Sequence, residues 1–307
     1  MSARLWALVG ATGTGKTALS LRLAEAIHTA GGAAEVVNAD AMQLYRGMDI
    51  GTAKLPEAER RGIPHHLFDV LEPAEEAAVA AYQDAARAAI SQIHERGADA
   101  ILVGGSGLYV SSVVFDFRFP PHDDALRAAL EERLLREGPG ALFAELRAQD
   151  PVTAARIDPR NGRRVVRALE VLAQGAATHG AALPEEPALW HPRTQLVGVH
   201  VERSELVLRL DERVHGMWKA GLPAEAAALQ EQGLGVTAQR AIGYAQALAQ
   251  LRGELTESEA IAQTQALTRR YARRQVSWFR RYPSIRWVDP AADAGELLAA
   301  PFRTAHP

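Results

Sequence analysis

The chain has 307 residues, of which 48% are hydrophobic and 23% charged, so it is long enough for about two domains with an ordinary globular core. It contains no cysteine, which excludes disulfides, thiolate zinc sites and a cysteine nucleophile. The net charge of −3, taken alone, argues mildly against a nucleic-acid partner, but this average hides local basic segments. There is no leader-like segment before the first predicted strand and no apolar run long enough to cross a bilayer, so we expect a soluble, cytoplasmic protein.

The first predicted elements surround a glycine-rich turn. A short apolar run from Leu5 to Val9 predicts a strand, and the segment from Ala18 to Ile27 predicts a helix. Between them, the G-x-x-x-x-G-K-[ST] spacing of a P-loop is formed by Gly10, Ala11, Thr12, Gly13, Thr14, Gly15, Lys16 and Thr17. Glycines let backbone amides approach phosphate oxygens, Lys16 supplies a positive charge, and Thr17 supplies a hydroxyl for Mg²⁺. The motif predicts a diphosphate or nucleotide site without identifying the ligand.

A second predicted strand, Ala34 to Val37, is followed by a polar segment that contains Asp40. In a parallel sheet, residues just past the carboxyl ends of the strands gather at one edge, so we expect Asp40 to face the phosphate site. Its position alone favours the role of a turn former or helix N-cap. Further along, His65 and His66 are adjacent and have no third ligand nearby, so we predict a structural role for them rather than a metal site.

The next predicted elements are a helix from Glu76 to Arg96 and a buried strand from Asp99 to Val103. P-loop proteins that hydrolyse ATP usually have an acidic residue at the end of such a strand to hold Mg²⁺. Here Gly104-Gly105-Ser106-Gly107 follows the strand, which weakens the interpretation as a motor or switch ATPase. The glycines predict instead that the backbone comes close to a bulky group, with Ser106 as a hydrogen-bonding residue.

The middle of the chain changes character after Phe119-Pro120-Pro121. Helices are predicted at 124–137, 141–149, 151–157 and 161–174, and a strand at 195–201 resumes the α/β pattern. We therefore predict an α/β protein, with a P-loop NTPase-like parallel sheet core formed by 1–121 and 187–307 and an all-helical insertion at 122–186. Within the insertion, basic residues at helical spacing predict a phosphate-facing stripe, the alternative being a solvated helix face, at Arg160, Arg163, Arg164 and Arg167.

The last third contains a second basic segment. Helices are predicted at 203–219, 223–232 and 257–281, the last one capped by Thr256, and a strand is predicted at 285–288. Within the long helix, Thr268 to Arg281 has six arginines interleaved with Tyr271, Trp278 and Phe279. Arginines can contact a nucleic-acid backbone and aromatic rings can stack on bases, although aromatic residues on a helix more often belong to a core.

Taken together and in this order, seven motifs resemble those of the tRNA dimethylallyltransferases, also called tRNA isopentenyltransferases. The first four are GATGTGKT at 10–17, NADAMQLYRGMDIGTAK at 38–54, IPHHLFDV at 63–70 and LVGGSGLYV at 102–110. The other three are DPRNGRRVVRALEV at 158–171, RAIGY at 240–244 and TRRYARRQVSWFRR at 268–281. The resemblance covers nearly the whole chain and is far more specific than the P-loop alone. The lack of cysteine suits the bacterial type, since eukaryotic members add a zinc finger.

This resemblance implies transfer of a dimethylallyl group from dimethylallyl diphosphate to the exocyclic N6 amine of the adenine on the 3′ side of the anticodon in tRNA, with release of diphosphate. It implies that Lys16 and Arg240 bind the diphosphate together with the P-loop, and that Mg²⁺ is held at Thr17. Asp40 is implied as the general base. Ser106 stands where the family usually has threonine, so the hydroxyl for a hydrogen bond to the adenine or to Asp40 is kept. The implied catalytic residues are Asp40, Ser106 and Arg240.

The implied partner is the anticodon stem-loop of tRNA, with the target adenine flipped out of its stack and the helical insertion gripping the RNA. We expect a monomer that does not associate with membranes. By match to the motifs, RNA contacts are expected from Asp40, Ala41, Met42, Gln43, Ser106, Arg127, Arg163, Arg164, Val165, Val166, Arg167, Arg240, Ala241, Ile242, Gly243, Tyr244, Ala245, Arg273, Arg274, Gln275, Val276, Ser277, Trp278, Phe279 and Arg280.

Three other functions are compatible with parts of the sequence. A small-molecule kinase using ATP would explain residues 1–110 but would leave both arginine segments without a role. A non-catalytic RNA-binding module with a vestigial P-loop would not depend on Asp40 or Lys16. A relative that prenylates free AMP or ADP would not need the basic insertion.

Overall fold

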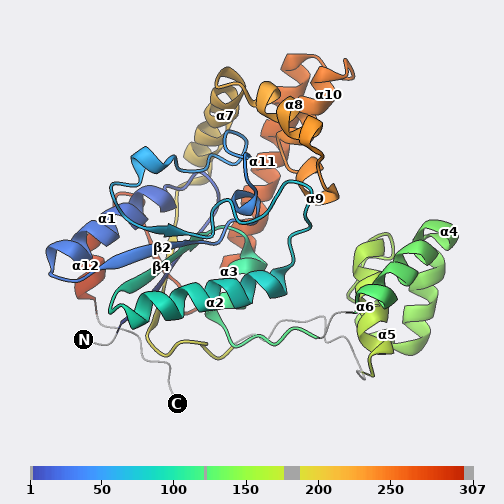
Figure 1. The fold of residues 1–307 in the computed structure, drawn as a ribbon, viewed down its shortest axis with the longest axis horizontal. Coiled ribbons are helices and arrows are strands. Elements are labelled where there is room, and N and C mark those ends of the chain that lie inside the picture. Colours follow the sequence, from blue (N-terminus) through green and yellow to red (C-terminus); the bar gives the residue numbers. More distant parts are fainter. Residues whose placement is uncertain (1–2, 121–122, 176–186, 301–307) are drawn as a thin grey trace. The chain divides into compact units, whose positions relative to one another are not determined.

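The computed structural model describes residues 3–120, 123–175 and 187–300, and the chain forms two compact units (Figure 1). The larger unit consists of Met1–Phe117 and Ala188–Pro307, and the smaller unit is Arg118–Pro187. The smaller unit begins at Arg118 rather than at the predicted residue 122. The reason is local, because the side-chain amide of Gln83 donates a 2.8 Å hydrogen bond to the carbonyl of Phe117 and holds it to the larger unit.

The larger unit is built on a six-stranded sheet in the order β3-β2-β4-β1-β5-β6, in which all neighbouring strands are parallel. The central strand β1 lies between β4 and β5 and is buried along its whole length, which is why it reads as an unbroken apolar run. This arrangement confirms the predicted α/β class. The strands are β1 (Leu5–Val9), β2 (Ala34–Asn38), β3 (His65–His66), β4 (Asp99–Gly104), β5 (Thr194–Val199) and β6 (Arg286–Val288).

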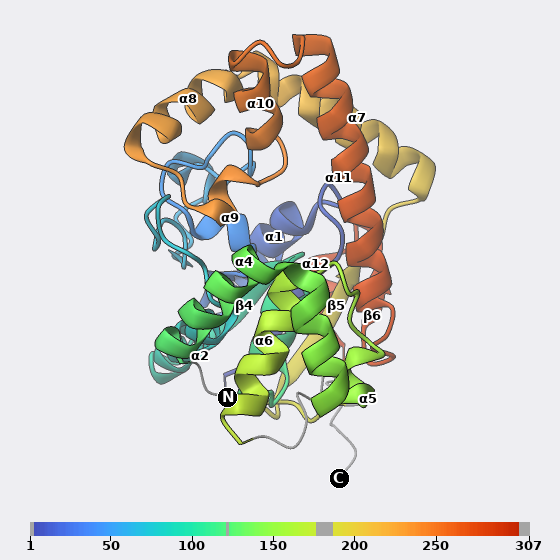
Figure 2. The same cartoon turned by 90° about the vertical axis from the view of Figure 1, so that its right-hand side faces the viewer.

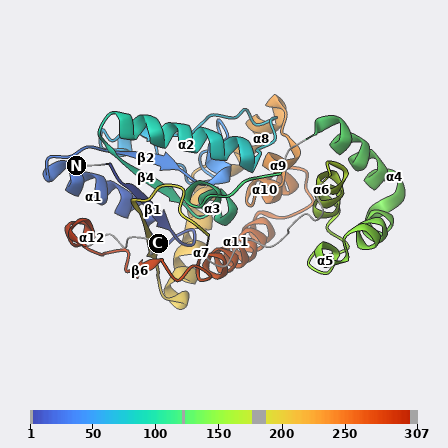
Figure 3. The same ribbon diagram turned by 90° about the horizontal axis from the view of Figure 1, so that it is seen from below.

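Helices cover both faces of this sheet, as Figure 3 shows. On one face α1 (Lys16–Thr29) packs beside α12 (Ala294–Ala299), and on the other face lie α2 (Val79–Glu95) and α3 (Gly107–Val114). The core between the sheet and the α1 face includes Trp6, Leu8, Leu19, Leu23 and Leu297. Because helices cover both faces, the functional groups of the sheet are accessible at the edges where the strands end.

A group of helices lies beyond the carboxyl edge of the sheet (Figure 2). These helices pack around a second core that includes Trp218, Leu222, Tyr244 and Leu248, with Tyr45 and Met48 from the loop after β2. These helices therefore cover the carboxyl ends of the strands. The group consists of α7 (Arg203–Lys219), α8 (Leu222–Gln232), α9 (Val236–Gln239), α10 (Tyr244–Leu251) and α11 (Glu257–Phe279).

The smaller unit is entirely helical over its described residues, as predicted. Its helices are α4 (Asp124–Gln149), α5 (Pro151–Ala154) and α6 (Gly162–Ala173), which share a core of leucine and valine side chains. The predicted break between 137 and 141 is seen inside α4, where Gly138 has a φ of 79° and Pro139 follows. Asp123, Asp150 and Asn161 cap the three helices through side-chain hydrogen bonds to backbone amides.

The prediction missed the shortest elements. The strand β3 and the helices α3, α9, α10 and α12 were not expected, because periodicity is weak over segments of two to eight residues. In the part of the chain that the structure describes, no helix has the length and apolar character needed to cross a membrane.

Candidate active site

The loops that follow β1, β2 and β4 meet at the carboxyl edge of the sheet, as the sequence predicted. Beside them is a cavity of about 320 Å³, to which the helices α7, α10 and α11 also contribute. Its charged and polar lining includes Thr12, Asp40, Ser106, Arg213, Arg240, Tyr271 and Arg274. Its apolar lining includes Met42, Val214, Met217, Ala241 and Ile242. The cavity thus combines an acid, several cations and an apolar surface.

The P-loop adopts the backbone that its glycines predict. Gly13 and Gly15 have φ values of 80° and 88°, which other residues rarely adopt, and α1 begins directly after Gly15. The loop is closed from within, because the hydroxyl of Thr14 donates to the carbonyl of Ala11 at 2.9 Å. The amine of Lys16 donates to the same carbonyl at 2.7 Å. The loop and the start of α1 therefore lie together as an anion-binding turn.

Lys16 is electrostatically linked to the cavity. Burial lowers the pKa of Lys16 to about 8, the negative charge of Asp40 opposes this decrease, and the positive charge of Arg213 adds to it. These three charges therefore act on one another. An anion placed between Lys16 and Arg213 would be attracted by both cations.

Asp40 caps a short helix, as its position in the sequence suggested, and it also lines the cavity. Its carboxylate caps the short 3-10 helix Ala41–Leu44, since Oδ1 accepts a 3.0 Å hydrogen bond from the amide of Met42. Asn38 holds the backbone in place, because its Oδ1 accepts from the amide of Asp40 at 2.9 Å. Asp40 also lines the cavity, and within the described residues no hydrogen bond reaches its Oδ2. One carboxylate oxygen is thus fixed, and the other is available to a ligand.

Ser106 and Tyr271 stand next to Asp40. The hydroxyl of Ser106 accepts a hydrogen bond from the amide of Ala41 at 3.1 Å and lies 3.5 Å from the hydroxyl of Tyr271. Ser106 therefore bonds to the backbone beside Asp40 rather than to its carboxylate. Burial raises the pKa of Tyr271 to about 12, and the charge of Asp40 acts in the same direction. Tyr271 keeps its proton at neutral pH and can donate it in a hydrogen bond.

The glycines after β4 do approach bulky groups, which confirms that prediction. A Cβ on Gly105 would lie 2.3 Å from Nε2 of Gln275, and a Cβ on Gly107 would lie 2.4 Å from the ring of Trp278. Both side chains come from α11. The loop after β4 is therefore packed directly against the helix that carries the second arginine segment.

Arg213 is a candidate site residue that the sequence analysis missed. It lines the cavity from α7 and donates to the carbonyl of Thr52 at 3.2 Å. Burial lowers the pKa of its guanidinium, and the charge of Asp40 opposes the decrease. The sequence contained a usable signal, since Arg213 falls three residues after Leu210 and within the stripe of the buried residues Leu206, Leu210 and Val214. A charged residue in an apolar stripe is a candidate for function.

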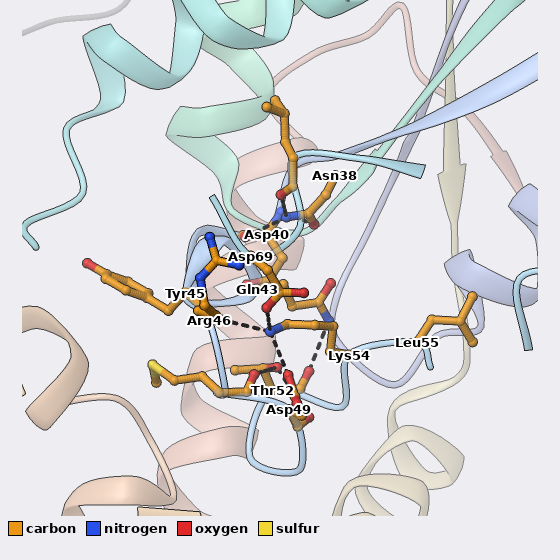
Figure 4. A network of polar contacts seen from close by, with 12 residues as sticks. Asn38, Asp40, Gln43, Tyr45, Arg46, Asp49, Thr52, Lys54, Leu55 and Asp69 are labelled. Carbon is orange, nitrogen blue, oxygen red and sulfur yellow. Dashed lines mark hydrogen bonds and ion pairs between the residues drawn. The ribbon is translucent and has the colours of Figure 1, made fainter. Parts of the chain in front are cut away.

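A polar network holds the loop that forms one wall of the cavity, and its central residue, Lys54, was also missed. In Figure 4, the amine of Lys54 points toward the carbonyl of Tyr45 and the carboxylates of Asp49 and Asp69. The three distances are 2.8, 2.6 and 2.6 Å. Because the amine is almost fully buried, this pairing fixes the loop instead of leaving a charge for a ligand.

Glu225 of α8 holds the same loop from the opposite side. Its carboxylate accepts hydrogen bonds from the backbone amides of Asp49, Ile50 and Gly51, and from the hydroxyl of Tyr244 at 2.5 Å. Burial and the neighbouring carboxylate raise the pKa of Tyr244. The cavity wall at Gly51 and Thr52 is therefore held in place by contacts within the protein.

The residues expected to contact RNA fall into three groups by exposure. Exposed positions include Arg163, Arg164, Arg240, Arg273, Arg274, Ser277 and Arg280. The second group is buried and consists of Ser106, Val165, Val166, Ala241, Gly243, Tyr244, Gln275 and Phe279. Ser106, Ala241 and Tyr244 line the cavity, whereas the other five do not. Buried residues match the family motif because they build the fold around the site. The third group is partly exposed and consists of Asp40, Ala41, Met42, Gln43, Arg127, Arg167, Ile242, Ala245, Val276 and Trp278.

The arginines of the insertion are more engaged than the sequence suggested. Glu170 is fully buried, and Arg127 and Arg167 donate to its carboxylate at 2.7 and 2.9 Å. Arg160 lies before α6 and pairs with Asp158, so it is not part of a helical stripe. Two of the predicted RNA contacts, Arg127 and Arg167, therefore serve the interior of the smaller unit as well.

The long helix α11 also differs from the expectation of six arginines without acidic partners. Arg269 pairs with Asp211 at 2.6 Å, and Arg281 stacks on the ring of Trp278 at 4.2 Å. Phe279 is buried, as the core interpretation of the aromatic residues predicts. Arg273 and Arg280 are exposed and have no ion pair within the described residues.

The histidine pair has the predicted structural role. His66 contacts Glu35 at 2.6 Å, and His65 contacts the carbonyl of Ile63 at 2.8 Å. Over residues 3–120, 123–175 and 187–300, no group of three or more His, Cys, Asp or Glu side chains is arranged to hold a metal ion.

Comparisons with known proteins place the chain in a family. The family model described as IPP transferase matches residues 43–282. A curated relative, tRNA dimethylallyltransferase of Clavibacter sepedonicus, is 59% identical over 94% of each chain. The structure of a tRNA isopentenylpyrophosphate transferase from Bacillus halodurans has 39% identity and a TM-score of 0.66, over 94% of this chain and 90% of that one. The structure of a eukaryotic dimethylallyltransferase acting on tRNA has 28% identity and a TM-score of 0.77, over 97% of this chain and 75% of that one. The chain therefore belongs to the IPP transferase family, the family of the tRNA dimethylallyltransferases.

Proposed function

We propose that the protein transfers a dimethylallyl group from dimethylallyl diphosphate to the N6 amine of the adenine on the 3′ side of the anticodon in tRNA, releasing diphosphate. The observation that carries this proposal is the cavity beside the P-loop, which both Asp40 and Arg213 line and in which their charges act on each other. The names of the relatives support both the group transferred and the RNA acceptor.

The phosphate end of the donor fits the P-loop side of the cavity. Backbone amides of the loop and the amine of Lys16 would bind the diphosphate, and Arg213 and Arg240 would approach it from α7 and from the segment before α10. Negative charge grows on the diphosphate as it leaves, so cations that are already in place lower the barrier. The apolar lining at Met42, Val214 and Met217 suits the hydrocarbon part of the donor.

A magnesium ion fits this site as a companion of the diphosphate. Thr17 is exposed in the first turn of α1, and its hydroxyl makes no hydrogen bond within the described residues, so it is free to bind an ion. Mg²⁺ often takes one or two protein oxygens and completes its shell with phosphate oxygens and water. Thr17 would hold the ion, which would neutralise part of the charge of the diphosphate.

Asp40 is proposed as the general base. The nitrogen of the adenine amine attacks C1 of the donor, the bond between C1 and the bridging oxygen breaks, and the electron pair of that bond leaves with the diphosphate. Asp40 accepts the proton that the amine loses, through the oxygen that does not cap the 3-10 helix. The hydroxyls of Ser106 and Tyr271, which lie beside it, can hydrogen-bond to the adenine.

Incubation with labelled donors tests this function. Purified protein would receive tRNA or AMP as acceptor, and dimethylallyl diphosphate or ATP as donor, followed by mass spectrometry of the nucleosides. Dimethylallyl incorporation into one adenosine of tRNA is expected. Incorporation into AMP alone, or phosphate transfer without prenylation, would contradict the proposal. A monomeric state and a cytoplasmic location remain predictions, as does binding of the anticodon stem-loop by the helical insertion.

Diphosphate affinity is expected to fall as the pH rises through about 8. Lys16 is protonated below its pKa of about 8 and loses its charge above it, so the ligand-free protein must take up a proton to bind at high pH. The affinity for inorganic diphosphate should decrease about tenfold between about pH 7 and about pH 9, measured by calorimetry with Mg²⁺ present. Lys16→Met removes the titrating group and should show only the titration of the ligand itself. An equal pH dependence in both proteins would contradict this prediction.

RNA binding is expected to weaken steeply with salt. The exposed arginines of α11 would contact phosphates and displace condensed cations, so log K should fall linearly with the logarithm of the salt concentration. Arg273→Gln should reduce the slope by about one, measured with a labelled anticodon stem-loop. Arg252→Gln is the control, because Arg252 is exposed but pairs with Glu254 in the turn between α10 and α11. A slope that is unchanged by Arg273→Gln would argue against this contact.

A further inference from the structure

Gln275 is a buried polar residue that connects two loops of the site. Its side-chain oxygen accepts a 2.9 Å hydrogen bond from the amide of Thr12 in the P-loop. Its side-chain nitrogen donates a 2.8 Å hydrogen bond to the carbonyl of Gly105 after β4. The side chain is only 4% exposed, so neither bond is exchanged easily for one to water. One side chain of α11 therefore joins the phosphate-binding loop to the loop that carries Ser106.

The neutral amide of Gln275 satisfies both partners, whereas an ionised carboxylate of the same shape could only accept. The backbone amide of Thr12 can only donate and the carbonyl of Gly105 can only accept, so one end of the side chain must accept and the other must donate. The contact is close, since a Cβ on Gly105 would also lie 2.9 Å from the carbonyl of Gly10. Both bonded groups belong to the site: Thr12 of the P-loop lines the cavity, and Gly105 directly precedes Ser106, which also lines it.

We propose that Gln275 is a positioning residue that sets the distance between the P-loop and the loop after β4. It would thereby place the diphosphate relative to Ser106, Tyr271 and Asp40, instead of contacting RNA as the motif match implied. This inference rests on the proposed prenyl transfer. We call this pair of hydrogen bonds the Gln275 clamp. A displacement of reacting groups by about 1 Å can lower the rate of an enzymatic reaction about a hundredfold, so we expect the clamp to act on the chemical step.

The placement of Gln275 also relates the RNA-facing side of α11 to the donor site. Arg273 and Arg280 lie on the exposed side of the helix, whereas Gln275 and Trp278 face the loop after β4. Trp278 supports the same loop one turn further along, because it packs on Gly107 and donates to Ser111 at 3.1 Å. A rigid helix thus holds RNA on one side and fixes the geometry of the donor loops on the other.

The test uses the full-length variants Gln275→Met and Gln275→Glu. Methionine is similar in length and lacks both hydrogen bonds, whereas glutamate keeps the acceptor for Thr12 but sets a carboxylate oxygen against the carbonyl of Gly105. Three quantities are measured for each variant: affinity for the anticodon stem-loop, affinity for inorganic diphosphate with Mg²⁺, and the single-turnover rate at saturating RNA. Matched controls are Gln263→Met and Gln263→Glu, because Gln263 is exposed on the same helix.

Gln275→Met is expected to keep its RNA affinity within about twofold, to bind diphosphate more weakly, and to lose about a hundredfold in single-turnover rate. Gln275→Glu should be equally slow at neutral pH. It should recover relative to wild type as the pH falls, because a protonated carboxyl can again donate to Gly105. The Gln263 variants should match the wild type.

Loss of RNA affinity with a normal single-turnover rate would overturn the proposal in favour of a direct RNA contact. Unchanged rate and unchanged diphosphate affinity would overturn it as well. Amide exchange of the wild-type chain needs no variant: Thr12 is expected to exchange slowly without ligand, and fast exchange would contradict the clamp. If the wild type itself transfers no prenyl group, the proposed function fails, whereas the diphosphate and exchange measurements still test the clamp.

Discussion

Asp40→Asn is expected to lower the single-turnover rate of prenyl transfer by about 10²–10⁴ while leaving tRNA affinity nearly unchanged. Asparagine has almost the same shape as aspartate and keeps an oxygen at the position of Oδ1, which accepts from the amide of Met42. The 3-10 helix Ala41–Leu44 therefore stays capped. The side chain cannot accept a proton from the adenine amine, so only the chemical step is affected. Rapid-quench measurement at saturating donor and RNA isolates this step.

Asp40→Ala provides the comparison that separates the two roles of the residue. Alanine removes both the proton acceptor and the cap, and loss of an N-cap costs about 1 kcal/mol of stability. We therefore expect equally slow chemistry in both variants, with a lower melting temperature in Asp40→Ala alone. A normal single-turnover rate in Asp40→Asn, or a loss of rate that follows the loss of stability, would contradict the assignment of Asp40 as the base.

The capping role of Asp40 is physically compatible with its proposed role as a general base. A general base must hold its proton-accepting oxygen in one direction, and the hydrogen bond from Met42 fixes the carboxylate plane by using the other oxygen. The amide of Asp40 is itself held by Asn38, and the carbonyl of Asn38 accepts from Tyr82 at 2.8 Å. In the proposed mechanism, the capping hydrogen bond would therefore also position the base. The sequence analysis treated capping and catalysis by Asp40 as alternatives. The two roles are compatible, because each would use a different oxygen of the carboxylate.

Features encoded in local sequence were predicted well. The apolar run of β1 matches the strand from Leu5 to Val9, because a central parallel strand is buried on both faces. The P-loop was recognisable because its function depends on backbone conformation, which glycine spacing reports directly. The glycines after β4 were informative for the same reason, since close backbone approach excludes a Cβ whatever residue lies opposite.

Features created by tertiary contacts were missed or assigned a different role. Nothing near Gln275 in the sequence reveals that its partners are Thr12 and Gly105, which lie 263 and 170 positions away. The spacing of the arginines in the insertion suggested a free basic stripe. The contact between Arg127 of α4 and the buried Glu170 of α6 exists only in the fold, so the spacing could not reveal it. The spacing of charged residues along the sequence does not show which of them form ion pairs. The charge available to a ligand depends on this pairing in the fold.

Arg213→Gln is expected to lower kcat/KM for the donor by about 10²–10³, with a weaker affinity for diphosphate. Arg213 is half-buried beside the charges of Lys16 and Asp40, in a setting where a cation stabilises a leaving anion more than it would in water. Its bond to the carbonyl of Thr52 also orients the guanidinium toward the cavity. Steady-state kinetics with dimethylallyl diphosphate and saturating tRNA measure the effect.

Two further variants distinguish a specific contact from general charge or loss of fold. Arg213→Lys keeps the positive charge but loses the planar fork, so it should recover only part of the rate if Arg213 binds the diphosphate through two donors. Arg209→Gln removes an arginine of the same helix that pairs with Glu205 on the surface, and it should leave kcat/KM unchanged. If Arg209→Gln and Arg213→Gln lowered the rate equally, a long-range charge effect would explain both. If neither did, the leaving diphosphate would have to be stabilised by the P-loop, Lys16 and Arg240 without α7.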